Sequence, residues 1–306
     1  MNAPTMIRRS LRRILRALIA AAVVAAALAG GLWWYLHPAV TRTNAVAYGE
    51  RRGQTLALDV MRPARPNGAA VLLLVSGGWR SKPPGTFGVW MAAPLRRRGY
   101  AVIPVYHLSQ PEVSIMEIVD DMHRAVRFVR HRAADFGIDP QRIGVTGGSA
   151  GGHLSLMLAT RGGPGRPESA DPVDRQSSAV QATALFFPGT DLLNLGRSTE
   201  NPGDGGPPKS FVKGFGPEAT DMDKWRVIGR DTSPIYHITP ALPPVLIHHG
   251  DADTLTPLEQ TEWFRAAAEK AGRRVEVVVR RGAGHGWLTM PWDIRQFAVW
   301  FDRHLR

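Results

Sequence analysis

The chain has 306 residues, of which 44% are hydrophobic, and this length is sufficient to bury one sizeable core. Its formal net charge is +12, but the first sixteen residues hold five arginines, and the remaining charge forms no basic block or aromatic-interleaved basic stripe. Nucleic-acid binding is therefore not expected. Because the chain contains no cysteine, disulfides, thiolate metal sites and cysteine nucleophiles are excluded.

The N-terminal segment predicts a membrane-spanning or signal helix. Residues 17–36 carry no charge, and a helix needs about twenty such residues to cross a bilayer. Arginines precede this segment and none follows it immediately, which favours the N-terminus inside and the rest of the chain outside. Trp33, Trp34 and Tyr35 fall where an outer aromatic belt would lie. The lack of a polar face argues against a buried helix of a cytoplasmic protein.

The same segment also has features of a cleaved export signal. Ala27-Leu28-Ala29 before Gly30 is an acceptable signal-peptidase site, and Arg8-Arg9 or Arg12-Arg13 is a candidate twin-arginine export signal. We therefore expect residues 1–40 to be a signal anchor or a signal peptide. The rest of the chain is expected to lie outside the cytoplasm, anchored to the inner membrane in the periplasm, or exported after cleavage.

The body of the chain alternates strand patterns with helix patterns. After a short linker around residues 37–44, residues 54–63 alternate as a half-buried strand, and the last predicted helix covers residues 292–305. Alternating strands and helices predict a mostly parallel central sheet covered by helices on both faces, in one domain over residues 41–306. Continuous apolar runs typical of buried strands occupy residues 69–75, 100–109, 142–147, 180–187, 243–250 and 275–282, with helical spacing over residues 115–129 and after Pro257.

Two stretches break this alternation. Residues 161–178 are rich in Gly, Pro and charge, which predicts a mobile surface loop. Residues 192–241 combine a segment rich in Gly and Pro with scattered large apolar residues, which predicts an irregular or partly helical insertion. Insertions of this length commonly cover a site, and the alternative is a solvent-exposed excursion without a role.

A glycine-rich motif surrounds Ser149. Residues 147–151 read Gly-Gly-Ser-Ala-Gly, which satisfies G-x-S-x-G between a predicted strand and the predicted start of a helix. A serine in this context lies on a strained strand-to-helix turn, where glycines avoid collisions with the sheet and the helix. A phosphate-binding loop is disfavoured because no Lys-Ser/Thr follows and the G-x-G-x-x-G pattern is not met.

A nucleophilic serine needs a base, and the base needs an acid that orients it. His285 follows a predicted strand in a loop of small residues, from which an imidazole can reach the serine. Asp251 and Asp253 precede it after the strand at 243–250, so the chain order is Ser, Asp, His. No metal is expected, because this loop lacks the glycine and the other oxygen ligands of a calcium loop.

The other histidines are expected to be structural. His153, one helical turn after Ser149, is expected to pack or cap locally, and His248 and His249 end a predicted strand. The polar faces of predicted helices are expected to carry His123, His131 and His304.

These motifs together resemble the esterase/lipase branch of the α/β-hydrolase superfamily, near its carbohydrate-esterase and hormone-sensitive-lipase-like members. The resemblance covers roughly residues 48–305, and its motifs occur in the order of the family. It implies an α/β-hydrolase fold, with residues 41–306 as the catalytic domain and residues 192–241 as a cap-like insertion. The motifs that carry it are LLLVSGGW at 72–79, RIGVTGGSAGGHL at 142–154, FFPGTDLL at 186–193, SPIYHITPALPPVLIHHGDADTLTP at 233–257 and GAGHGW at 282–287.

The resemblance also implies roles for individual residues. Ser149 matches the nucleophile, His285 the base and Asp253 the acid, which leaves Asp251 to hold its loop together. The family's oxyanion loop, His-Gly-Gly-Gly-Trp, appears here as Val75-Ser76-Gly77-Gly78-Trp79. The implied oxyanion-hole donors are the backbone N–H groups of Gly77, Gly78 and Ala150, and the candidate walls of the substrate pocket are Trp79 and Trp287.

The implied function is a serine hydrolase that cleaves carboxylic esters of small molecules or carbohydrates through an acyl-enzyme intermediate, without cofactor or metal. The predicted N-terminal helix adds a membrane as a partner. Two alternatives remain open. One is an amidase or peptidase of the same fold, and the other is a membrane-anchored, non-catalytic binding protein that keeps the fold.

Overall fold

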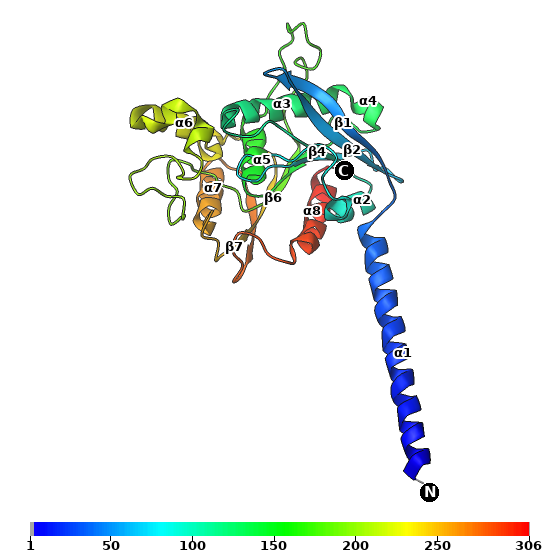
Figure 1. Cartoon of the computed structure of the whole chain (residues 1–306). Coiled ribbons are helices and arrows are strands. Elements are labelled where there is room, and N and C mark those ends of the chain that lie inside the picture. The colour runs from blue at the N-terminus through cyan, green and yellow to red at the C-terminus, as the bar shows by residue number, and fades with distance from the viewer. Residues whose placement is uncertain (1–2, 306) are drawn as a thin grey trace.

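The computed structural model describes residues 3–305, and side chains from residue 11 onward, so the side chains of Arg8 and Arg9 lie outside the described part. Helix α1 (Ala3–Leu36) projects from the body as one long rod (Figure 1). The most apolar 18-residue window of its segment Leu11–Leu36 has a mean hydropathy of 2.1, and none of this window is buried against the body. By length and composition this helix can cross a membrane, and a signal sequence would meet the same criteria.

An eight-stranded sheet forms the centre of the body, with strand order β1-β2-β4-β3-β5-β6-β7-β8. All neighbouring strands from β4 to β8 pair in parallel, whereas β2 runs antiparallel to both β1 and β4. The mostly parallel sheet predicted from the alternation is confirmed. The strands are β1 (Val40–Arg51), β2 (Gln54–Pro63), β3 (Ala70–Leu74), β4 (Ala101–Val105), β5 (Ile143–Thr146), β6 (Ala182–Phe186), β7 (Val245–Gly250) and β8 (Val275–Arg280).

Strand β1 corrects the predicted linker at residues 37–44. The strand begins at Val40 and pairs with β2 along its whole length. It lies at the edge of the sheet, and most of its side chains are exposed or half-buried, so no apolar alternation marks it in the sequence.

Helices cover both faces of the sheet (Figure 1). One face carries the 3₁₀ turn η1 (Val89–Ala92) with α2 (Ala93–Arg97) and α8 (Met290–His304), and their apolar side chains pack together with those of the central strands. The opposite face carries α3 (Ile115–His131), α5 (Ala150–Arg161) and α7 (Leu258–Lys270). A capping box formed by Ser114 and Glu117 begins α3. The short helix α4 (Ala133–Phe136) follows α3.

The predicted insertion, residues 192–241, is irregular and partly helical. It contains η2 (Val212–Phe215), η3 (Pro217–Thr220), α6 (Met222–Asp231) and η4 (Pro234–His237). Residues 162–178 contain no helix or strand.

Candidate active site

Ser149 lies at the sharp turn between β5 and α5. Its φ is 54° and its ψ is −122°, in a left-handed region that residues other than glycine rarely adopt. A Cβ on Gly147 would lie 2.4 Å from the carbonyl oxygen of Gly151, and a Cβ on Gly151 would lie 2.6 Å from that of Leu74. Backbone therefore packs on backbone around Ser149, and only glycine fits at these two flanking positions.

Ser149, His285 and Asp253 form a hydrogen-bonded chain. Oγ of Ser149 lies 2.9 Å from Nε2 of His285, and Nδ1 of His285 lies 2.8 Å from Oδ2 of Asp253. The three side chains follow β5, β8 and β7, whose C-terminal ends meet at one edge of the parallel sheet. The other carboxylate oxygen of Asp253 accepts hydrogen bonds from the N–H groups of Leu255 at 2.9 Å and Thr256 at 3.0 Å, which fixes its orientation.

Asp253 is only 5% exposed. Burial alone would raise the pKa of its carboxyl group, but hydrogen bonds from His249, His285 and the backbone N–H of Thr256 outweigh burial and lower that pKa well below its usual range. Asp253 is therefore a carboxylate at neutral pH. A carboxylate facing Nδ1 keeps the imidazole proton on that nitrogen, which leaves Nε2 of His285 free to accept the Ser149 hydroxyl proton.

Two residues that the sequence did not identify also contact His285. Oγ1 of Thr256 lies 3.2 Å from Nδ1 of His285 and 3.1 Å from Oδ2 of Asp253. The ring of Phe187 lies against the imidazole, with a centroid distance of 4.5 Å. The closeness of Thr256 to Asp253 in the sequence was an available signal, whereas the Phe187 contact joins two loops far apart in the chain.

The predicted oxyanion-hole donors are not equivalent. The N–H of Gly77 donates to the carbonyl oxygen of Arg80 at 2.9 Å, which closes a tight turn and contradicts the prediction that Gly77 is a donor. Gly78 and Ala150 donate no backbone hydrogen bond among the described residues, and both line the pocket that contains Ser149. Ala150 is the first residue of α5, where the helix dipole favours a negative charge.

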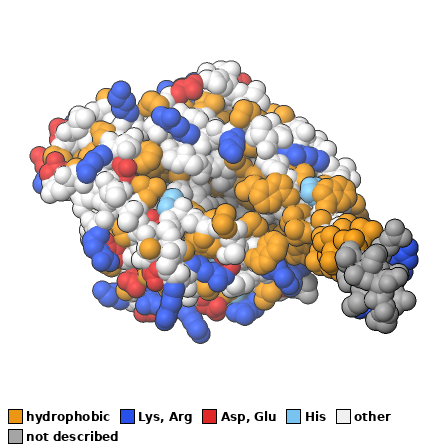
Figure 2. Space-filling model, turned by 60° about the horizontal axis from the view of Figure 1, so that its bottom comes forward, with side chains coloured by type: hydrophobic (Ala, Val, Ile, Leu, Met, Phe, Trp, Pro, Cys, Tyr) orange, Lys and Arg blue, Asp and Glu red, His pale blue; other side chains and the backbone are white. Residues whose placement is uncertain are grey.

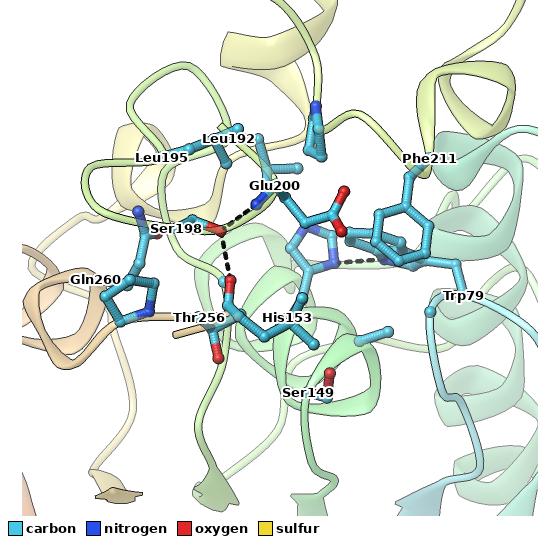
Figure 3. A pocket seen from close by; sticks show the side chains of 16 residues that line it. Trp79, Ser149, His153, Leu192, Leu195, Ser198, Glu200, Phe211, Thr256 and Gln260 are labelled. Carbon is cyan, nitrogen blue, oxygen red and sulfur yellow. Dashed lines mark hydrogen bonds between the residues drawn. The ribbon is translucent and has the colours of Figure 1, made fainter. Parts of the chain in front are cut away.

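Ser149 lies at one end of this pocket, which has about 610 Å³ of space between the surrounding atoms, part of it open to solvent (Figure 3). Trp79 and Phe211 lie side by side along one wall, with ring centroids 5.2 Å apart. Residues of the insertion form much of the remaining wall, so this segment lies over the site. They are Leu192, Leu195, Ser198, Glu200, Pro208 and Phe211.

His153 holds Trp79 in this wall. The indole N–H of Trp79 donates to Nδ1 of His153 at 3.1 Å, and Nε2 of His153 donates to the carbonyl oxygen of Thr232 at 2.7 Å. Burial lowers the pKa of His153 to about 4, so its imidazole is neutral at neutral pH. The local packing role predicted for His153 is confirmed by these contacts.

Trp287 was predicted to line the pocket of Ser149, and this prediction is wrong. Trp287 instead lines a second cavity on the α8 side of the sheet. Its indole N–H donates to a carboxylate oxygen of Asp293 at 2.6 Å. Asp251 accepts a hydrogen bond from the N–H of Gly282 at 2.6 Å, which ties together the loops after β7 and β8 as expected.

The strand-end histidines are buried, as expected of structural residues. Nε2 of His249 donates to the carbonyl oxygen of Thr256 at 2.6 Å. His248 packs edge-to-face on Phe297, and neither of its ring nitrogens has a hydrogen-bond partner among the described residues. His123 was expected on the polar face of its helix, but it is buried: its side chain is 7% exposed, and its Nδ1 lies 3.0 Å from Oγ of Ser178.

The fold and this edge of the sheet define an α/β-hydrolase. The chain belongs to the BD-FAE family, whose family model matches residues 58–267, a range that includes Ser149 and Asp253. Esterase LipQ of Mycobacterium tuberculosis is 30% identical over 76% of this chain and 53% of its own length. The chain thus spans about half the length of the curated relatives that it matches first.

Solved structures show the same fold. A carbohydrate esterase from gut microbiota superposes with a TM-score of 0.69 at 24% identity, covering 87% of this chain and 98% of its own. Esterase 2 of Thermogutta terrifontis, solved with butyrate bound, gives a TM-score of 0.62 at 28% identity, covering 84% of this chain and 92% of its own. The resemblance to the esterase/lipase branch of the α/β-hydrolases is confirmed, and the family and fold are those of carboxylic ester hydrolases.

Proposed function

We propose that the protein hydrolyses carboxylic esters by two-step acyl transfer through Ser149. The observation that carries this proposal is the hydrogen-bonded chain from Ser149 through His285 to Asp253. It opens into a pocket lined by Gly78 and Ala150, whose backbone N–H groups have no partner among the described residues. The names of the relatives support it. The T. terrifontis esterase has also been seen phosphoramylated by tabun, a reaction that requires a nucleophile in that enzyme.

In the first step, Nε2 of His285 accepts the Ser149 proton as Oγ attacks the carbonyl carbon of the ester. The N–H groups of Gly78 and Ala150 donate to the oxyanion, and each such donor contributes on the order of 3 kcal/mol to transition-state stabilisation. Asp253 stabilises the imidazolium that forms. His285 then gives its proton to the leaving alcohol, so the products of this step are the alcohol and acyl-Ser149.

In the second step, His285 accepts a proton from water as the water oxygen attacks the acyl-enzyme carbonyl. The oxyanion accepts hydrogen bonds from the same two N–H groups. Its collapse breaks the bond to Ser149 Oγ, which regains the proton from His285. The carboxylic acid leaves and the free enzyme is restored.

The first test is hydrolysis by the full-length chain in detergent of p-nitrophenyl esters of increasing acyl length, beside the matching p-nitroanilides. We expect ester hydrolysis that Ser149→Ala abolishes while thermal stability is unchanged. Ser149-dependent hydrolysis of the anilides alone would instead identify an amidase. A folded protein that turns over neither class and does not react with a fluorophosphonate would be a binding protein with this fold.

Helix α1 is proposed as a signal anchor, with residues 1–40 as the anchor, residues 41–306 as the catalytic domain outside the cytoplasm and residues 192–241 as its cap. The support is a direct joint between helix and body. Nε of Arg97 in α2 donates to the carbonyl oxygen of Tyr35 at 2.6 Å, and the Arg97 guanidinium lies 3.9 Å from the centre of the Trp34 ring.

Mass spectrometry of the N-terminus after cell fractionation tests this placement. An intact N-terminus in the membrane fraction, with the body accessible to protease only from the periplasm, is the expected result. A chain that begins at Gly30 and is found in a soluble fraction would identify a cleaved signal peptide instead.

A further inference from the structure

The second cavity lies behind the turn that carries Ser149, on the face of the sheet covered by η1 and α8. Gly147 and Gly148 of this turn line the cavity, whereas the next two residues, Ser149 and Ala150, line the pocket described above. It has about 1110 Å³ of space between the surrounding atoms, part of it open to solvent, and none of its lining side chains is charged. The η1 and α8 side is formed by Met91, Trp287, Leu288, Met290, Ile294 and Phe297.

The mouth of this cavity is an exposed apolar surface. Leu288 is 99% exposed, and Met91, which also lines the cavity, is 39% exposed. Trp90 precedes Met91 and Trp292 follows Pro291, which also lines the cavity, and about half of each tryptophan is exposed. A contiguous exposed surface of this kind marks contact with a protein, a ligand or a membrane.

The end of α1 lies beside this surface. The helix contacts both η1 and α2, and Arg97 holds the carbonyl oxygens of Trp34 and Tyr35. Figure 2 shows hydrophobic side chains gathered over the part of the body next to α1, beside a hollow in the same face. With α1 placed in a membrane as proposed above, Trp33 and Trp34, which are about two-thirds exposed, would lie at its interface, and the mouth of the cavity would lie at the same level.

The same loop joins the mouth of the cavity to the catalytic base. His285 and Leu288 are three residues apart, and Trp287 between them lines the cavity. The Trp287 ring packs against Phe187, which itself packs against His285. The catalytic base and part of the lining of the cavity therefore belong to one short loop.

We propose that the second cavity takes the hydrocarbon chain of an ester that resides in the membrane spanned by α1, so that the enzyme acts on lipophilic esters at the membrane surface. This inference rests on the proposed ester hydrolysis and names its substrate class. A hydrocarbon chain that leaves a bilayer for water loses its apolar surroundings, whereas one that enters an uncharged cavity at the interface keeps them. A mouth at the interface thus removes the main cost of extracting such a substrate.

The test uses the full-length chain in vesicles of ether-linked phosphocholine lipid, which offer no competing ester. Hydrolysis of 4-methylumbelliferyl palmitate within these vesicles is compared with that of water-soluble 4-methylumbelliferyl acetate. The variants are Leu288→Glu at the mouth and Ile294→Glu in the wall. The matched control is Val227→Glu on α6, where the valine is 70% exposed and lines neither cavity.

We expect both cavity variants to lose at least tenfold in palmitate hydrolysis and to keep acetate hydrolysis within twofold of the unmodified chain, while Val227→Glu changes neither. Unchanged acetate hydrolysis also shows that the variants fold. If palmitate and acetate hydrolysis respond equally to Leu288→Glu and Ile294→Glu, or if neither responds, the inference is overturned.

A binding measurement separates this inference from the proposed function. The Ser149→Ala chain is titrated with the hexadecyl ether of 4-methylumbelliferone, which has no ester to cleave, and we expect Ile294→Glu to raise its Kd at least tenfold. Loss of ether binding in this variant without any Ser149-dependent hydrolysis would refute the hydrolase but support the cavity. If acetate hydrolysis depends on Ser149 but Ile294→Glu leaves the Kd of the ether unchanged, the hydrolase is supported and the proposed role of the cavity is refuted.

Discussion

Replacing Asp253 by asparagine should disable His285 without disturbing the fold. Two backbone N–H groups, of Leu255 and Thr256, donate to Oδ1 of Asp253 at 2.9 and 3.0 Å. The amide oxygen of an asparagine must take this place, because the amide nitrogen cannot accept those bonds. The NH₂ group then faces Nδ1 of His285, which lies 2.8 Å from the second oxygen in the native chain.

An NH₂ group donates to Nδ1 and so moves the imidazole proton to Nε2, the nitrogen that faces Ser149. His285 can then no longer accept the serine proton. A tautomer error of this kind lowers kcat by about 10⁴-fold, equivalent to about 5 kcal/mol of transition-state stabilisation. The lost charge of Asp253 acts in the same direction, because it no longer stabilises an imidazolium.

The assay is kcat on p-nitrophenyl butyrate for Asp253→Asn and for its matched control, Asp251→Asn. Among the described residues, the carboxylate of Asp251 accepts one hydrogen bond, from the N–H of Gly282, and none from His285. We expect Asp251→Asn to keep activity within about threefold, because an asparagine oxygen can accept the same bond. Equal losses in the two variants would refute the assignment of Asp253 as the orienting acid.

Three further predictions concern the fold around the site. Gly147→Ala should lower the free energy of unfolding by at least about 2 kcal/mol, because the added Cβ would lie 2.4 Å from a backbone oxygen. Gly163→Ala is the control and should leave the free energy of unfolding unchanged, because its Cβ would have no atom within 4 Å; thermal unfolding of the two variants tests this difference. Burial lowers the pKa of His248 to about 4, so the unfolded chain takes up the proton first and stability falls as the pH drops from 6.5 towards 4. His248→Leu should make this loss shallower by about 1 kcal/mol per pH unit, and an unchanged slope in unfolding measurements would contradict the assignment. Arg96 is 2% exposed with no hydrogen-bond partner for its guanidinium among the described residues, so Arg96→Met should raise the free energy of unfolding by about 1–3 kcal/mol, and a lower melting temperature would be the opposite result.

The elements that the sequence predicted best are those whose pattern is local. The buried strands carry continuous apolar runs, and the G-x-S-x-G turn carries its own steric requirement, so both could be placed without knowledge of the tertiary structure. Strand β1 escaped detection because an edge strand has no fully buried face. His123 was misplaced because residues 162–178, which hold its partner Ser178, fold back onto α3.

The details of the site that were missed depend on contacts between distant loops. The N–H of Gly77 is engaged by Arg80 through a turn whose closure depends on a left-handed φ at Gly78 and Trp79. Trp287 follows His285 by two residues, yet it points to the opposite side of the Ser149 turn. The order and spacing of the motifs in the sequence identified the right loops, but they did not determine which side of the sheet edge each side chain faces.

The Ser149 turn is bonded to its neighbours on both sides. The N–H of Ser149 donates to the carbonyl oxygen of Phe186 at the end of β6, and the N–H of Gly151 donates to that of Ser76 after β3. The insertion over the pocket, in contrast, accepts neither of these two bonds, and it consists of loops, 3₁₀ turns and helix α6. Mutations that reshape the insertion can therefore accumulate without moving the reacting hydroxyl, so that relatives of this chain can acquire new substrates while keeping one chemistry.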